Sequence, residues 1–97
     1  MKSIFIAFDQ AYTDQIVDLL STNHVRGFTR WEEVHGRGSK AGQPHYGSHA
    51  WPTVNSAMIT VVDDHKVKKI LEDLRQLDLT SHQMGIRAFV WNVEDVM

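Results

Sequence analysis

Residues 56–77, SAMITVVDDHKVKKILEDLRQL, place a strand directly before a helix. The first seven residues are nearly all apolar and rich in β-branched side chains, which is typical of a central strand covered on both faces. Asp63 or Asp64 can then cap a helix. From Val67 onward the apolar residues follow the spacing i, i+3, i+4, i+7 and i+10, while most charged residues lie on the opposite side. The stretch therefore predicts a central strand followed by an amphipathic helix.

The same order occurs near the N-terminus. Residues 2–8 are apolar at nearly every position and predict a second central strand. Residues 9–23 repeat apolar groups at helical spacing, with Asp9 and Thr13 as candidate N-caps. Residues 28–35 form a more polar segment, which predicts an edge strand or one that pairs with another subunit. The first half of the chain is thus a strand, a helix and a strand.

The C-terminal part completes the second half. Residues 78–85 form a polar connector, and residues 86–93 alternate in polarity as a strand does. Two βαβ halves in so short a chain predict an α+β fold, the ferredoxin-like β-α-β-β-α-β sandwich, with an antiparallel sheet and both helices on one face.

The other face of that sheet has no helix to cover it. Both faces of the central strands are nevertheless apolar, and the strands carry Trp31 and Trp91. Because monomers rarely expose a large apolar patch, we expect sheets from several subunits to pack together.

Composition limits the function. A chain of 97 residues with 42% apolar residues has room for one core. A net charge of −2 gives no general attraction to nucleic acid or to anionic lipid. The absence of cysteine removes disulfides and thiolate metal sites. The N-terminal apolar run is too short for a signal peptide or a membrane span, so we expect a cytoplasmic protein without membrane insertion.

Residues 34–52, VHGRGSKAGQPHYGSHAWP, form a long connection between two predicted strands. Connections longer than about 12–15 residues are usually functional or disordered. Its glycines give backbone freedom, and its basic, histidine and aromatic side chains can hold a ligand or a partner. This loop is the first candidate for function.

Two stretches resemble a known family. GFT at residues 27–29, followed by EVHGRG at 33–38, a long loop and the strand at 58–62, resembles the PII nitrogen-regulatory signalling proteins. RAFVWNVEDV at 87–96 resembles the last strand of that family in the same register. The resemblance implies a single ferredoxin-like domain over residues 1–97 with a T-loop-like insertion at about 36–54. It also implies a homotrimer that binds an effector, commonly an adenine nucleotide, in clefts between subunits. Such a protein is a regulator of a transporter or an enzyme through its T-loop, and is not itself an enzyme.

The site residues follow from their chemistry and from this resemblance. Glycines allow backbone N–H groups to approach an anion closely, and basic side chains add charge for phosphate or carboxylate recognition. The expected effector-binding residues are Gly36, Arg37, Gly38, Lys40 and Arg87. The expected partner-binding residues of the loop are His45, Tyr46, His49 and Trp51.

One segment departs from the family pattern. Typical members carry a glycine-rich phosphate loop before the last strand, whereas TSHQMGIR at residues 80–87 keeps one glycine and has arginine in place of lysine. The chain therefore resembles the divergent PII-like proteins, whose ligand can be a different nucleotide, a small anion or a metal.

A metal-binding alternative rests on His45 and His49, which are four residues apart. It would make the chain a trimeric divalent-metal-binding protein akin to the CutA proteins. Since there are no thiolates, further ligands would have to come from other subunits or from Glu32 and Glu33. No nucleophile–base motif, Walker loop or dinucleotide fingerprint is present, so the sequence gives no support for catalysis.

Overall fold

The computed structural model describes residues 1–37, 44–45, 54–81 and 85–97. The elements in order are β1 (Lys2–Asp9), the 3₁₀ turn η1 (Gln10–Tyr12), α1 (Thr13–Thr22), β2 (Thr29–Val34), β3 (Gly36–Arg37), β4 (Pro44–His45), β5 (Asn55–Val62), the 3₁₀ turn η2 (Asp64–Lys66), α2 (Val67–Thr80) and β6 (Arg87–Asn92). None of the helices in these ranges is long and apolar enough to span a membrane.

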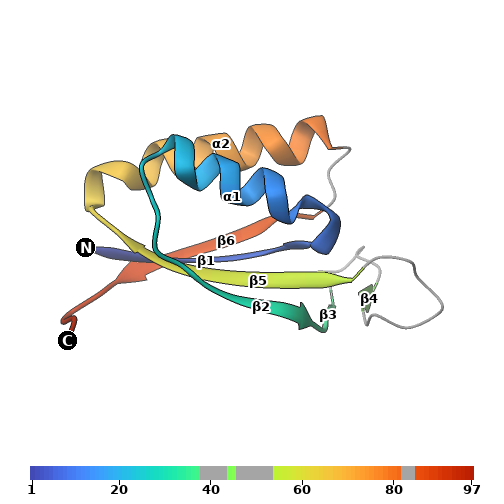
Figure 1. Cartoon of the computed structure of the whole chain (residues 1–97), viewed down its shortest axis with the longest axis horizontal. Helices are drawn as coiled ribbons and strands as arrows, with labels where there is room; N and C mark the ends of the chain where they lie inside the picture. Colours follow the sequence, from blue (N-terminus) through green and yellow to red (C-terminus); the bar gives the residue numbers. More distant parts are fainter. Residues whose placement is uncertain (38–43, 46–53, 82–84) are drawn as a thin grey trace.

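Four strands form one antiparallel sheet in the order β2-β5-β1-β6, and α1 and α2 lie side by side on one of its faces (Figure 1). The predicted ferredoxin-like α+β fold is therefore confirmed. The four main strands begin and end within one residue of their predicted bounds. A second sheet of two short strands, β3 and β4, lies within the segment expected to be loop.

The core lies between the sheet and the two helices. Alternate residues of β1, Ile4, Ile6 and Phe8, point into it and are almost completely buried. Ile16 of α1 and Ile70 of α2 meet them from above. Each such side chain stabilises the fold by about 1.5–3 kcal/mol relative to full exposure. The two periodicities read from the sequence, 2 for the strands and 3.6 for the helices, therefore converge on one core.

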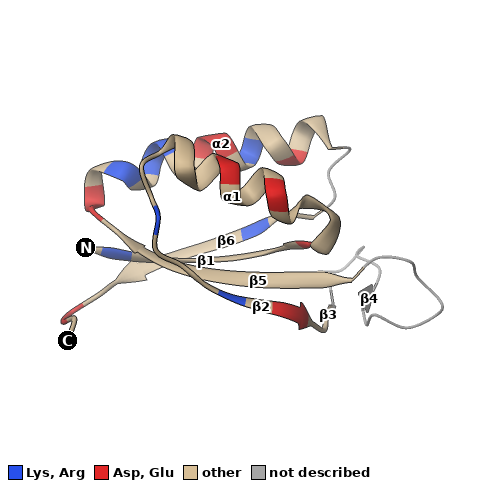
Figure 2. Cartoon of the chain, in the orientation of Figure 1, with Lys and Arg blue, Asp and Glu red and all other residues tan. Residues whose placement is uncertain are grey.

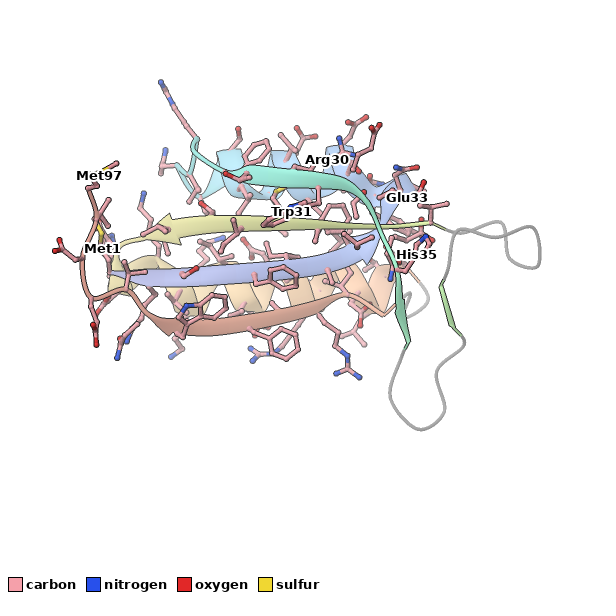
Figure 3. The ribbon with its side chains drawn as sticks, turned by 90° about the horizontal axis from the view of Figure 1, so that it is seen from below. Met1, Arg30, Trp31, Glu33, His35 and Met97 are labelled. Atoms are coloured by element: carbon pink, nitrogen blue, oxygen red, sulfur yellow. The ribbon has the colours of Figure 1, made fainter. Side chains whose placement is uncertain are left out.

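The opposite face of the sheet carries no helix, and Figure 3 views the molecule from that side. The strand register aligns its side chains in three rows: Trp91, Ser3 and Val61; Phe89, Phe5, Ile59 and Thr29; and Arg87, Ala7, Ala57 and Trp31. We call these residues the helix-free face. Figure 2 shows charged residues along the helices and at strand ends, whereas the middle of β1 and the whole of β5 carry none.

The helix starts differ from one another. The Asp9 carboxylate accepts a hydrogen bond from the Ala11 N–H (2.9 Å), so Asp9 is a cap as predicted, although it caps η1. At the second helix, Asp63 occupies the N-cap position of η2 without a side-chain cap bond. Asp64 forms an ion pair with the N-terminal ammonium (2.9 Å), which lowers its pKa. The prediction that one of these two aspartates caps the helix through its side chain is not supported by the geometry.

The end of α2 lies later than the sequence indicated. The helix continues through Asp78 to Thr80, whereas residues 78–85 were expected to be connector. The Thr80 hydroxyl donates back to the carbonyls of Gln76 and Leu77 (3.0 and 3.1 Å). The Thr80 side chain thus bonds back onto the last turn of this longer helix.

A polar link joins the two helices. The Asn23 side-chain amide, just after α1, donates to the Asp73 carboxylate of α2 (2.9 Å), which also accepts from Lys69 (2.8 Å). The Lys69 ammonium, followed by the Asn23 amide, lowers the pKa of Asp73. The helix layer is thereby tied together at its surface as well as through the core.

Candidate functional site

The predicted functional loop leaves the sheet at one end, where four strand termini meet. Asp9 at the end of β1 pairs with Asn55 at the start of β5, and Asn55 also pairs with Val34 at the end of β2. Arg87 begins β6 at the same end, opposite Ala7. The antiparallel order thus places both ends of the loop and Arg87 at the same end of the sheet, although Arg87 lies on β6, the edge strand opposite β2.

The segment just after β2 is paired rather than open. Gly36 pairs with His45 and Arg37 with Pro44, which extends the chain away from the sheet as a short ribbon (Figure 3). A Cβ added to Gly36 would meet no atom of the described chain within 4 Å. The protomer's own packing in those ranges therefore does not require glycine at position 36, and its backbone is open to an approaching group.

Arg87 lies on the helix-free face in the row nearest the loop. Its row continues through Ala7 and Ala57 to Trp31, so an arginine and a tryptophan flank two small residues. The Trp31 ring leans toward Phe5 of the adjacent row, with ring centroids 6.3 Å apart. Arg87 also lines a hollow of about 320 Å³ along the outer edge of β6, together with Arg75 and Asp78 of α2.

Asp78 is a feature that the sequence reasoning missed. Its Oδ1 atom accepts hydrogen bonds from two consecutive backbone N–H groups, those of Gly85 (3.1 Å) and Ile86 (3.0 Å). Gly85 has φ +84°, a conformation that favours glycine. Consecutive N–H groups that converge in this way form an anion-binding turn. Here the chain's own carboxylate fills it, directly before Arg87.

A second missed feature lies at the loop ends. The Glu32 carbonyl accepts hydrogen bonds from the Ser56 hydroxyl (2.5 Å) and the Gln10 side-chain amide (2.9 Å). The Gln10 backbone N–H donates to the Val54 carbonyl (2.6 Å). No periodicity or motif in the sequence signals that residues 10, 32, 54 and 56 meet, because their contacts depend on the strand register.

The His35 Nε2 atom lies 3.5 Å from a carboxylate oxygen of Glu33 at the point where β2 ends, and both side chains are more than half exposed. Exposed pairs of this kind contribute little to stability. Across the described ranges, no three histidine or acidic side chains gather as metal ligands would. The structure thus provides no metal centre within those ranges.

Several expected site residues lie outside the described residues: Gly38, Lys40, Tyr46, His49 and Trp51. For Arg37 and His45 only the backbone pairing is described. Gly36, Arg37 and Arg87 therefore lie at the same end of the sheet, with Arg87 on β6 and Gly36–Arg37 following β2 at the opposite edge.

A smaller hollow of about 190 Å³ lies at the opposite end of the sheet. It is lined by Met1, His24, Val25, Arg26, Gly27, Val61, Val62, Asp63 and Lys66. The Lys66 ammonium donates to the His24 carbonyl (3.0 Å), which holds η2 against the segment that leads into β2.

The fold and the position of the loop agree with a sequence-family comparison. The model of the family described as Nitrogen regulatory protein P-II matches residues 1–97. The chain belongs to the P-II family. This membership confirms the resemblance seen at residues 27–38 and 87–96 and places the chain among regulatory signalling proteins.

Solved PII-like structures share the fold at low sequence identity. One is CPII from Thiomonas intermedia K12, a nitrogen regulatory PII-like protein that was solved with ADP and bicarbonate. Its sequence is 22% identical to this chain. The structures superpose with a TM-score of 0.78, and the match covers 95% of this chain and 84% of CPII. Its apo form gives 18% identity and a TM-score of 0.74 over 95% and 87%. A PII-like signalling protein from Thermus thermophilus gives 21% and 0.69 over 95% and 85%. No curated protein matches the chain by sequence.

Proposed function

We propose that this P-II family member binds a small effector, an adenine nucleotide or another anion, in clefts between the subunits of a homotrimer. It would then regulate a partner protein, such as a transporter or an enzyme, through the T-loop-like segment at residues 36–54. The observation that carries this proposal is the position of Arg87 on the helix-free face, at the end of the sheet where that segment leaves.

Assembly through the helix-free face is supported by its exposure. Phe89 is 58% exposed, Trp91 48%, Trp31 46% and Val61 45%. All four lie on this face, and contiguous apolar surface of this kind marks an interaction site. A second copy covers it best, because its middle carries no charge that an unlike partner would have to match.

Assembly on this face would complete the effector site. Arg87 lies in its outermost row, so a neighbouring subunit that covers the face would bring its own surface next to Arg87. An arginine guanidinium binds phosphate and carboxylate in two-pronged geometry. The Gly36–Arg37 backbone, Gly38 and Lys40 would supply the remaining contacts from the loop base.

The choice of ligand rests on two lines of support. PII-like CPII holds ADP and bicarbonate, or ADP, AMP and bicarbonate, in its solved complexes. In this chain, the Asp78 carboxylate occupies the N–H pair before β6, so a long polyphosphate would have to displace it. A nucleoside diphosphate, a monophosphate or bicarbonate therefore fits better than a triphosphate.

The partner-binding part of the proposal concerns His45, Tyr46, His49 and Trp51. Tryptophan and tyrosine dominate many protein interfaces, and these residues follow the base of the ribbon along the chain. Regulation would follow if effector binding at the base changes how this segment is presented.

Isothermal titration calorimetry with ADP, AMP and bicarbonate tests the proposal. We expect at least one of these ligands to bind, and Arg87→Ala to weaken that binding by about 10- to 100-fold, since a charge-assisted hydrogen bond is worth about 1.5–3 kcal/mol. Lys68→Ala is the matched control: it removes one positive charge from the exposed side of α2, away from the loop end. If none of the three ligands binds at millimolar concentration, or if both variants weaken binding equally, the proposal fails.

A further inference from the structure

Gln10, which lies outside the functional segment, hydrogen-bonds to the chain at both ends of that segment. We define the loop roots as residues 32–34, at the end of β2, and residues 54–55, at the start of β5. We infer that Gln10 is a positioning residue that ties these two roots together and thereby fixes the direction in which residues 36 and 37 leave the sheet. Only the expected effect on effector binding rests on the proposed function. The hydrogen bonds of Gln10 do not depend on it.

Gln10 reaches each root with a different group. Its backbone N–H donates to the Val54 carbonyl at 2.6 Å, and its side-chain amide donates to the Glu32 carbonyl at 2.9 Å. Val54 and Glu32 are 22 positions apart in sequence. One residue of η1 therefore bridges the segment that leaves the sheet and the segment that returns.

Gln10 itself is fixed by its neighbours. The Asp9 carboxylate caps η1, and the Thr13 hydroxyl at the start of α1 donates to the Gln10 carbonyl (2.8 Å). The backbone N–H, the backbone carbonyl and the side-chain amide of Gln10 are thus all hydrogen-bonded. Because η1 is continuous with β1 and α1, the roots are tied to the core and not only to each other.

The contact falls where β2 becomes irregular. The register of β2 against β5 shifts between Trp31 and Val34, which is the signature of a bulge. A bulge takes residues out of the regular ladder and turns the strand. Here the Glu32 carbonyl is bonded by the Gln10 and Ser56 side chains instead. The direction of the chain after the bulge therefore depends on these two side-chain donors.

Ser56 and Gln10 both donate to the Glu32 carbonyl, but they differ in how deeply they are buried. Ser56 is fully buried within β5 directly after the root at 54–55, and its hydroxyl bonds the Glu32 carbonyl of the other root. Gln10 is half-buried and contacts both roots, so it can be changed without opening the core. If the proposed effector residues at 36, 37 and 87 must be aligned for binding, Gln10 sets the position of two of them.

Gln10→Glu is the sharpest test, because it keeps the shape and the backbone N–H while replacing the donor by a carboxylate that repels the Glu32 carbonyl. Gln15→Glu, on the exposed side of α1, makes the same chemical change elsewhere. Hydrogen exchange of the ligand-free protein should quicken by about three- to tenfold at residues 34–37, 45 and 54–55 in Gln10→Glu, as expected for one lost hydrogen bond. Exchange in β1 and α2 should stay unchanged, and Gln15→Glu should match the wild type throughout.

Gln10→Lys restores a donor at this position and should return the exchange rates of the roots toward wild type. Equal rates at the roots in Gln10→Glu and Gln15→Glu would overturn the inference, as would a Gln10→Lys variant that exchanges as fast as Gln10→Glu. These measurements need no effector, so they can succeed even if ADP, AMP and bicarbonate all fail to bind. If a ligand does bind, Gln10→Glu should weaken it while Gln15→Glu does not.

Discussion

The two faces of the main sheet are made from alternate residues of the same strands, but in the protomer one face is buried and the other is partly exposed. Ile4 and Ile6 point toward the helices and are completely buried, whereas Phe89 and Trp91 on the other face are about half exposed. Both faces are apolar. Two helices can cover only one of them, so the chain encodes more apolar surface than its own fold can bury.

The first prediction tests whether the helix-free face is an interface between copies of the chain. Phe89→Glu combined with Trp91→Glu places two carboxylates where we propose that another copy packs. Since burial of an unpaired charge is strongly unfavourable, we expect the assembly to dissociate to monomers with unchanged helix content. Sedimentation velocity and circular dichroism provide the readouts. Leu79→Glu, at an exposed apolar residue of α2, is the control and should leave the assembly intact. A wild-type protein that is already monomeric at high concentration would contradict the prediction.

The second prediction compares adjacent residues of β1, one on each face. Ile6→Ala should lower the free energy of unfolding by about 2–5 kcal/mol, because it leaves a cavity in the core. Phe5→Ala should cost only about 1–2 kcal/mol, mainly through its contact with Trp31. Urea denaturation in the dissociated Phe89→Glu/Trp91→Glu background keeps assembly from contributing. Equal losses for the two variants would remove the distinction between the faces.

The third and smallest effect concerns Ser3, which lies on the helix-free face between Val61 and Trp91. Its hydroxyl is buried without a hydrogen-bond partner among the residues that the structure describes. An unsatisfied buried polar group costs about 1–3 kcal/mol, so Ser3→Ala should raise the free energy of unfolding by about 1 kcal/mol in the otherwise wild-type protein, where Trp91 still flanks Ser3. Urea midpoints measure this. A loss of stability would instead mean that the hydroxyl is hydrogen-bonded in solution.

Much of the fold could be read from periodicity. The central strands at 2–8 and 56–62 and the helix from Val67 are long and strongly patterned, and the structure has them within a few residues of the predicted bounds. The errors fall at element ends: α2 runs on to Thr80, and residues 36–37 and 44–45 pair as a ribbon instead of forming open loop. Local side-chain bonds and pairing between strand segments of the same chain occur at such ends, and neither produces a periodic pattern in the sequence.

The candidate site was predictable only in part. Its glycine and arginine chemistry at 36–37 and 87 could be named from residue type and from the resemblance to the P-II family. The Asp78 carboxylate on the Gly85 and Ile86 N–H groups, and the Gln10 link between the roots, could not. Aspartate and glutamine at helix and turn positions are common, and nothing in their local sequence indicates a distant partner.

The sequence alone determined the order of strands and helices, the apolar character of both sheet faces and the family, because periodicity and motif are local properties of the chain. Only the tertiary structure decided which polar groups meet at the loop end. Strand register places Gln10 beside Glu32 and Val54, and it places Arg87 in the outermost row of the helix-free face. Register is set by pairing between strands far apart in sequence, so it becomes visible only once the sheet has formed.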